Sequence, residues 1–230
     1  MKLSDYSRIV VFTGAGMSAE SGVPTYRGRG GIWQQYNYED YACEAAFRRD
    51  PRKVLDFHEL RRRHVLDCAP HAGHRHLTAL QRAHPSLSIV TQNIDGMHQR
   101  AGSHVAAELH GSLWRMRCAR HGAREDAGAG AFAARNCAQC GMPLRPDITW
   151  FGDPVDEAVF ARAHALVEAC ELFIAIGTSA VVWPAAGLIP AARRRRARLV
   201  EINPEETEGS EVFDEVLRAP ASKLPELLQP

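Results

Sequence analysis

The sequence predicts an α/β protein with a parallel, doubly wound sheet, and two observations carry that prediction. Short runs of β-branched and aromatic residues alternate with segments whose apolar residues recur at helical spacing. The connections between them are short, as in folds where each strand is followed by a helix. We therefore expect a Rossmann-like sheet, with a smaller domain made of a helical insertion and a cysteine-bearing module.

The composition is that of a chain able to bury a proper core. It has 230 residues, of which 45% are hydrophobic, and a net charge of +1. A balanced charge argues against bulk binding to nucleic acid or to an anionic membrane. No apolar run approaches the ~20 residues that span a membrane, and the N-terminus lacks the pattern of a secretion signal. We expect a monomeric cytoplasmic protein with no membrane partner and no specific nucleic-acid partner.

The first strand and the glycine loop after it organise the chain. Ile9–Phe12 is apolar on both faces, which is typical of a buried parallel strand, and Gly14-Ala15-Gly16 ends it. Glycines have no Cβ, so the backbone can approach a ligand closely while the next N–H groups point outward, which suits a phosphate. The dinucleotide fingerprint GxGxxG is not met, because Ala19 stands where its third glycine belongs. The following Gly- and Pro-rich stretch favours a flexible loop over a bound cofactor.

A helical insertion separates this loop from the next strand. In residues 31–84 the apolar residues recur at helical spacing, for example at Val54, Leu55 and Phe57. We therefore predict a large Rossmann-like unit formed by residues 1–30, 85–115 and 145–230. The smaller unit is predicted to contain the helical residues 31–84 and a metal-binding module at 116–144.

Polar side chains follow the second predicted strand, Leu87–Thr91. Gln92-Asn93-Ile94-Asp95 places amide and carboxylate groups at a strand tip, where ligands bind in parallel sheets. His110 lies in the segment Glu108–Ser112 soon afterwards, and an imidazole with a pKa near ~6.5 can accept a proton at neutral pH. The plainer interpretation of each segment is a polar turn.

Four metal-ligand side chains form two knuckles. Cys118 and His121 make the first, and Cys137 and Cys140 make the second. Each knuckle offers two ligands from one tight turn, and together they complete the tetrahedron of a structural zinc site. The alternative is that the metal has been lost and the thiols merely pack. The remaining cysteines, interpreted as small buried hydrophobes, are Cys43, Cys68 and Cys170.

The alternation of strands and helices continues to the C-terminus. The elements that we expect are a strand at Ile148–Phe151, a helix at Glu157–Cys170, a strand at Leu172–Ile176, a helix beginning at Val181 and a strand at Arg198–Ile202. Gly177-Thr178-Ser179 follows one of these strands, and its small hydroxyl residues suit a phosphate or ribose contact.

Taken whole, GAGMSAESGVPTYRG at residues 14–28 resembles the signature of the sirtuins, which are NAD-dependent protein lysine deacylases. Matching segments run over nearly the entire chain: QNID at 92–95, HG at 110–111, WFG at 150–152, GTS at 177–179 and NPE at 203–205. Structural zinc lies between HG and WFG in that family, where this chain has its two knuckles. One of the four ligands departs from the family, because His121 stands where a cysteine is usual.

The resemblance implies an activity, cofactors and site residues. The activity is removal of acetyl, succinyl or malonyl groups from the lysines of proteins or peptides, with nicotinamide and an O-acyl-ADP-ribose as products. The cofactors are NAD and a structural zinc, and the catalytic residues are the base His110 together with Asn93. The implied NAD-binding residues are Gly14, Ala15, Gly16, Ala19, Glu20, Pro24, Tyr26, Arg27, Trp33, Gln92, Asn93, Ile94, Asp95, Gly177, Thr178, Ser179, Asn203, Pro204, Glu205 and Ala221.

The resemblance also implies how the substrate binds. Trp150, Phe151 and Gly152 match a segment that pairs with the peptide backbone by strand addition. In the subgroup that removes succinyl and malonyl groups, a Tyr-x-x-Arg pair binds the acyl carboxylate. Arg61 matches the arginine of that pair, and His58 replaces the tyrosine. We hypothesise that desuccinylation persists and strengthens toward pH 6, where His58 would become charged.

Three other functions are open at this point. Transfer of ADP-ribose to protein is a close chemical neighbour of the deacylase reaction. A nicotinamide-dependent dehydrogenase is supported only by the first strand and its glycines, and the missing third glycine counts against it. A zinc-ribbon binding module is suggested by the cysteine knuckles, but the net charge and the long α/β remainder disfavour it.

Overall fold

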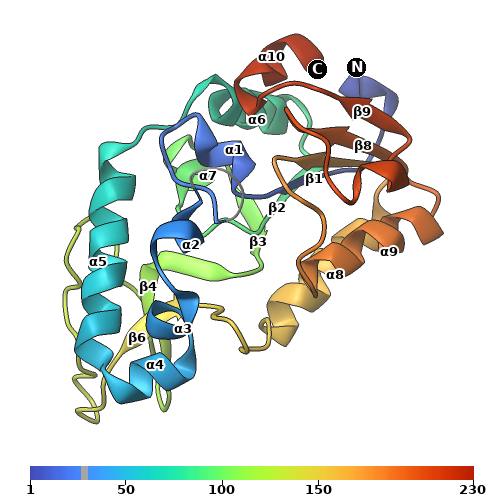
Figure 1. Ribbon diagram of the computed structural model, residues 1–230. Coiled ribbons are helices and arrows are strands. Elements are labelled where there is room, and N and C mark those ends of the chain that lie inside the picture. The colour runs from blue at the N-terminus through green and yellow to red at the C-terminus, as the bar shows by residue number, and fades with distance from the viewer. Residues whose placement is uncertain (27–30) are drawn as a thin grey trace.

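A fully parallel six-stranded sheet forms the centre of the protein in a computed structural model that describes residues 1–26 and 31–230. Its order is β3-β2-β1-β7-β8-β9, and every pairing is parallel (Figure 1). The strands are β1 Ile9–Thr13, β2 Leu87–Thr91, β3 Val105–Glu108, β7 Leu172–Ile176, β8 Arg198–Ile202 and β9 Glu215–Leu217. The central strands β1 and β7 are buried along their whole length, because helices cover both faces of the sheet. The predicted α/β class is confirmed.

Helices on the two faces of this sheet enclose two apolar cores. On one face, Phe12 and Phe173 pack with residues of α8 and α9. On the other face, Ile9 and Val11 pack with residues of α6 and α10. These helices are α6 Ala72–Ala83, α8 Glu157–Ala169, α9 Leu188–Arg194 and α10 Leu224–Leu227.

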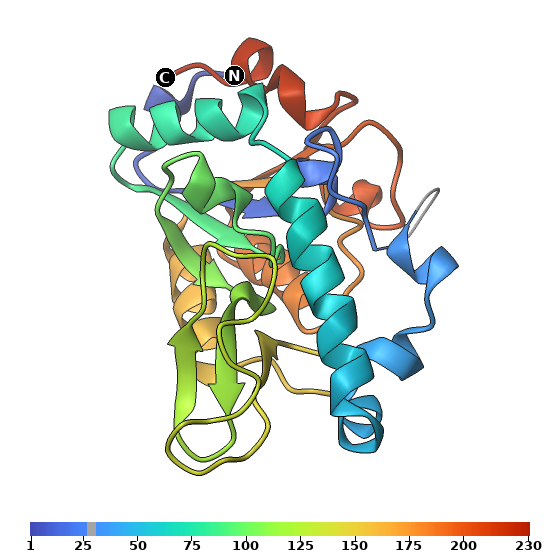
Figure 2. The ribbon, with the colours of Figure 1, turned by 90° about the vertical axis from the view of Figure 1, so that its left-hand side faces the viewer.

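A smaller three-stranded antiparallel sheet lies below the large one, and α5 runs alongside it (Figure 2). Its order is β5-β4-β6, with β4 Gly111–Cys118, β5 Gly122–Glu125 and β6 Arg145–Ile148. The helical insertion supplies α2 Ile32–Gln35, α3 Tyr38–Tyr41, α4 Glu44–Arg49 and α5 Pro51–Asp67. Asp50 caps α5, and Pro51 suits its first position because a proline has no N–H to leave unpaired. A third apolar core joins α5 to this small sheet.

Short helices complete the fold, namely α1 Gly16–Ala19 and α7 Met97–Arg100, with 3-10 turns at Leu3–Asp5, Ala185–Gly187, Ser210–Val212 and Ala221–Lys223. Over the described part of the chain, none of the helices combines the length and the apolar character needed to cross a lipid bilayer.

Two predicted elements lie elsewhere than expected. The strand predicted at Ile148–Phe151 is β6, Arg145–Ile148, because its pairing with β4 ends there and Thr149 instead donates its N–H to the carbonyl of His110. The helix expected from Val181 begins only at Leu188, after the 3-10 turn Ala185–Gly187. Helix α6 packs on the large sheet, and β6 belongs to the small one.

The strand order reverses between β1 and β7, the two central strands. In open parallel sheets the chains that leave two such strands turn to opposite sides, and ligands bind in the crevice outside their carboxyl ends. The glycine loop follows β1 and Gly177-Thr178-Ser179 follows β7, so the two predicted ligand loops meet at this crevice.

Candidate active site

The glycine loop after β1 lies directly against the loop after β7. A Cβ added to Gly14 would lie 2.7 Å from the Cβ of Thr178, and one added to Gly16 would lie 2.8 Å from the Cα of Gly177. The N–H of Gly16 donates to the carbonyl of Gly177 at 2.8 Å. Both glycines are therefore required by a close approach between two loops.

The tip of β2 joins these two loops. Gln92 Nε2 donates to Thr178 Oγ1 at 2.8 Å, and Asn93 Nδ2 donates to the carbonyl of Gly14 at 3.0 Å. Asp95 is also buried, and its burial raises the pKa of its carboxyl group, although the N–H of Met97 donates to it at 2.8 Å. The structure thus gathers the polar residues of three strand ends into one water-poor site.

His110 lies in the two-residue connection between the large sheet and the small sheet. It follows β3, which ends at Glu108, and precedes β4, which begins at Gly111. Its Nδ1 is 3.0 Å from the carbonyl of Gln92, which can only accept, so Nδ1 carries the proton and the Nε2 lone pair is available. Burial lowers the pKa of His110, partly offset by that hydrogen bond. The imidazole is therefore neutral at physiological pH and can act as a base.

A layer of buried polar side chains supports the tip of β2. His98 Nε2 lies 2.9 Å from Thr13 Oγ1, and the Thr13 hydroxyl donates to Thr91 Oγ1 at 2.8 Å. The Thr91 hydroxyl in turn accepts from the N–H of Asn93 at 3.0 Å. Burial lowers the pKa of His98 to about 4, so this layer is uncharged.

Ser18 and His74 complete the layer on the side of the glycine loop. The Ser18 hydroxyl lies 3.4 Å from His74 Nε2 and accepts from Asn93 Nδ2, also at 3.4 Å. One signal in the sequence could have identified His74. It precedes the core residue Leu77 by three positions, so it is a polar residue on the apolar face of α6.

The residues expected to hold the far end of a dinucleotide are only partly brought together. Asn203 Nδ2 donates to the carbonyl of Thr178 at 3.1 Å. The Glu20 carboxylate accepts from the N–H and the hydroxyl of Ser222 at 2.8 and 2.7 Å, beside the buried Ala221. Exposed positions are Ala19, Pro24, Ser179, Pro204 and Glu205. Arg27 lies outside the residues that the structure describes.

The predicted acyl-recognition pair lies in an aromatic environment on α5. His58 is buried and stacks on Trp150 at 5.9 Å between ring centroids, and its two ring nitrogens have no hydrogen-bond partner among residues 1–26 and 31–230. Arg61 Nη2 donates to the Tyr26 hydroxyl at 2.9 Å, and the Tyr26 ring lies 6.1 Å from that of Trp33.

The expectation that His58 becomes charged near pH 6 is wrong for this structure. Burial, reinforced by the charge of Arg61, lowers the pKa of His58 to about 3. The three residues predicted to bind the substrate peptide differ in their exposure. Trp150 faces the interior, whereas Phe151 and Gly152 are exposed.

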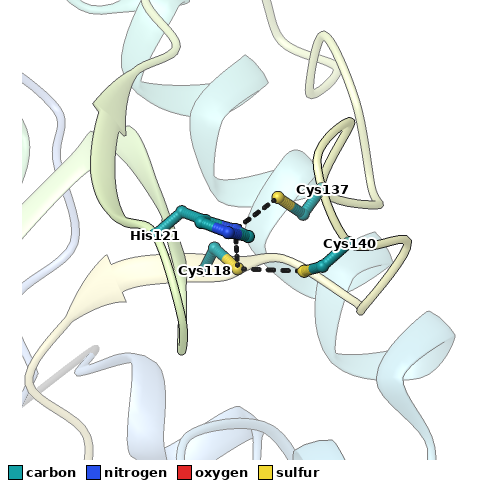
Figure 3. A group of neighbouring side chains, drawn as sticks. All are labelled: Cys118, His121, Cys137 and Cys140. Atoms are coloured by element: carbon teal, nitrogen blue, oxygen red, sulfur yellow. Dashed lines mark hydrogen bonds between the residues drawn. The ribbon is translucent and has the colours of Figure 1, made fainter.

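The two predicted knuckles form one compact group. Cys118 and His121 come from the β4–β5 hairpin, and Cys137 and Cys140 come from the loop before β6, with all four side chains turned toward one another (Figure 3). Their ligand atoms lie within 4.8 Å of one another, including 3.6 Å between the sulfurs of Cys118 and Cys140 and 3.3 Å from Cys137 Sγ to His121 Nδ1. Zinc–ligand bond lengths give tetrahedral edges of about 3.8 Å between sulfurs and about 3.5 Å between sulfur and nitrogen. The group fits zinc.

Fold and site together are those of a dinucleotide-binding α/β enzyme with a separate structural zinc centre. The Sir2 family profile matches residues 14–184. The chain belongs to the Sir2 family.

Individual relatives match nearly the whole chain. An NAD-dependent protein deacylase of Aquifex aeolicus is 39% identical over 93% of this chain and 90% of its own length. One from Aeropyrum pernix is 42% identical over 95% of this chain and 90% of its own length. Among solved structures, a Sir2 homologue bound to NAD is similar with a TM-score of 0.88 and 38% identity over 96% of this chain and 87% of that one. A Sir2 complex with a deacetylated p53 peptide and 3'-O-acetyl ADP-ribose is similar with a TM-score of 0.84 and 27% identity over 97% of this chain and 95% of that one.

Proposed function

We propose that this protein is an NAD-dependent protein-lysine deacylase that releases nicotinamide and an O-acyl-ADP-ribose. The observation that carries the proposal is a neutral His110 with a free Nε2, placed between two sheets beside the crevice of the glycine loop. The relatives named NAD-dependent protein deacylases support it. Bound NAD supplies a ribose carbon whose bond to nicotinamide can be broken. The protein's contribution is to orient the reactants, exclude water and accept a proton at His110 Nε2.

The polar tip of β2 is proposed to hold the nicotinamide end of NAD. Asn93 and Asp95 are buried beside the glycine loop, so a ligand there would exchange water for fixed polar groups. The raised pKa of Asp95 shows how poorly this place is solvated. Gly14, Gly16 and the residues after β7 would line the phosphates and the second ribose. Glu20 is proposed to act through Ser222, whose N–H and hydroxyl it already holds.

Peptide binding is proposed at the exposed Phe151 and Gly152, after the end of β6. An extended peptide could add main-chain hydrogen bonds there, which would tolerate many sequences. Trp150 would support this segment from the protein interior, since it is buried against His58.

We also propose that the smaller unit contains α2–α5 and the three-stranded sheet, and that the protein acts as a monomer.

Mass spectrometry of an acylated peptide incubated with the protein and NAD tests the function. We expect loss of the acyl group from lysine and, in equal amount, nicotinamide and an O-acyl-ADP-ribose. ADP-ribose found on protein or peptide, with the acyl group retained, would favour the transferase instead. A dehydrogenase would reduce the cofactor and leave both products absent.

The pocket at His58 and Arg61 is proposed to accept a succinyl group as well as an acetyl group. Arg61 has guanidinium N–H groups beyond the one donated to Tyr26, and these could pair with a carboxylate. A neutral His58 still offers one N–H, which could be donated to the acyl carboxylate. The acyl carboxylate would therefore receive opposite charge from Arg61 and none from His58.

The ratio of desuccinylation to deacetylation is expected to stay constant between pH 6 and pH 8. The pKa of His58 is about 3, so its charge does not change over that range. A succinyl carboxylate, with a pKa near ~4.3, stays ionised throughout. Values of kcat/KM for matched succinyl and acetyl peptides, measured in parallel at each pH, cancel the titration of His110 because both reactions use it.

The Arg61→Met variant provides the control for this comparison. Loss of a charge-assisted hydrogen bond worth roughly 1.5–3 kcal/mol should lower kcat/KM for the succinyl peptide about 10- to 100-fold and leave the acetyl peptide nearly unchanged. Equal losses on both peptides would remove Arg61 from acyl recognition. A ratio that rises toward pH 6 would mean that His58 gains a proton when substrate binds.

A further inference from the structure

The turn that carries His110 is held at both ends by one guanidinium group, that of Arg115. Arg115 lies on β4 and reaches back to β3, where its Nη1 pairs with Glu108 Oε2 at 2.5 Å. Its Nε pairs with Asp147 Oδ2 on β6 at 2.9 Å. Arg115 therefore links the edge of the large sheet to two strands of the small sheet.

Apolar side chains do not fill the space beside the ion pairs that Arg115 makes with Glu108 and Asp147. A cavity of about 490 Å³ lies there, lined by residues of β3, β4 and β6 and by the start of α8. Glu108, Arg115 and Asp147 are all among its lining residues. Apolar contacts of Ile94 and Met97 with Leu113 and Met116 join the small sheet to the end of β2. Beside the cavity, the ion pairs of Arg115 connect β3 to the small sheet.

The partners of Arg115 lie on either side of His110. Glu108 precedes His110 by two residues at the end of β3. Asp147 precedes Ile148, the residue that pairs with Gly111, and a Cβ built on Gly111 would collide with the Asp147 carbonyl oxygen. Gly111 has a φ of +75°, so the chain bends sharply at this point. One side chain thus fixes both the entry to the turn and its exit.

Both partners of Arg115 are themselves held in place. Glu108 Oε1 accepts from Gln99 Nε2 at 2.8 Å, and Asp147 Oδ1 accepts from Arg117 at 2.7 Å. Asp147 is buried, and the Glu108 side chain is only 15% exposed. A partly buried ion pair of this geometry is screened less by solvent than an exposed one.

We infer that Arg115 is a positioning residue for His110, holding the turn from Glu108 to Gly111 so that the imidazole meets Gln92 and the crevice. This inference rests on the proposed function, since it assigns His110 the role of base. Arg115 does not touch the reactants. Its loss should let the imidazole drift from the reacting atoms while the crevice that binds NAD remains intact.

Kinetics of the Arg115→Met variant test this inference. A displacement of about 1 Å can cost 10²-fold in rate, so we expect kcat for an acetyl peptide to fall by about 10- to 100-fold. The KM for NAD and the affinity for ADP-ribose, the latter measured by calorimetry, should stay within roughly twofold of the wild type. The substitution leaves the residues that bind the dinucleotide in place. Arg115→Lys should recover part of kcat, since an ammonium group can reach only one of the two carboxylates.

The matched control is Arg162→Met. Arg162 lines the same cavity from α8 but, among the residues that the structure describes, donates only to the backbone carbonyl of Ala106, so its loss should leave kcat unchanged. If Arg115→Met fails to fold, Glu108→Gln carries the test, because it removes the charge on the β3 side alone. The same fall in kcat is expected.

A His110→Ala variant measured in the same series separates the two hypotheses. If it is inactive while Arg115→Met and Glu108→Gln match the wild type, the positioning role is wrong and the proposed function stands. If it is fully active in deacylation, the assignment of His110 as the base fails, and the positioning role of Arg115 fails with it. A loss of ADP-ribose affinity in Arg115→Met would also overturn the positioning role, because it would indicate general damage to the crevice.

Discussion

Replacing His110 with alanine is expected to lower kcat for deacylation by about 10²- to 10⁴-fold, the usual contribution of a general base. The residue is neutral because burial lowers its pKa, and the Gln92 carbonyl holds the proton on Nδ1. Nε2 is therefore the only ring atom that can accept a proton. Steady-state kinetics with an acetyl peptide measure the effect, and calorimetry with ADP-ribose checks that the crevice still binds.

His104→Ala is the control for that experiment. His104 is an exposed histidine just before β3, six residues from His110, and it should be replaceable without loss. The assignment of His110 as the base is contradicted if His110→Ala keeps wild-type turnover. It is equally contradicted if both alanine variants lose the same activity.

Replacing Cys137 with alanine is expected to release the zinc and to unfold the module around it. Structural zinc contributes about 10–16 kcal/mol in small zinc-binding peptides, far more than a short loop segment gains from packing. The Cys137 thiol readily forms the thiolate that binds a metal, because the backbone N–H of Gln139 and further donors lower the pKa of Cys137 to about 6. Metal analysis should find one zinc per wild-type chain and almost none in the variant, with a lower Tm.

The damage should extend to α5. Arg62, which is fully buried on that helix, pairs with Asp126 at 3.1 Å and donates to the carbonyl of Ala129, both in the loop between the two knuckles. Since His58 and Arg61 lie on the same helix, deacylation should fall with the metal. Cys68→Ala serves as the control, because Cys68 lies outside the metal group and should change neither zinc content nor Tm appreciably. Unchanged stability without zinc would mean that the thiols only pack.

Sequence alone predicted the parts of the site whose geometry is local. The four zinc ligands form two pairs, and within each pair the ligands are three residues apart, so each tight turn delivers two ligand atoms to one point. Three of the predicted strands, at Leu87–Thr91, Leu172–Ile176 and Arg198–Ile202, have the bounds that the structure gives them. Short, largely apolar runs of this kind are typical of strands buried on both faces.

Local patterns predicted β6 less well. Its sequence, RPDI, has a proline and two charged residues, which are uncommon in strands, and the apolar run that follows drew the prediction three residues along the chain. The strand forms because β4 supplies partners at Gly111, Met116 and Arg117. Pairing with a distant segment overrode the local preference.

The sequence by itself determined the fold class, the family and the zinc ligand set, because each depends on residue types at short and regular spacing. Only the tertiary structure decided that His58 is uncharged, that Glu20 holds Ser222, and that Arg115 braces the turn of His110. Those properties depend on burial and on partners that can lie as far as 202 residues away in the sequence. Desolvation and charge pairing act through space, so no window of sequence contains them.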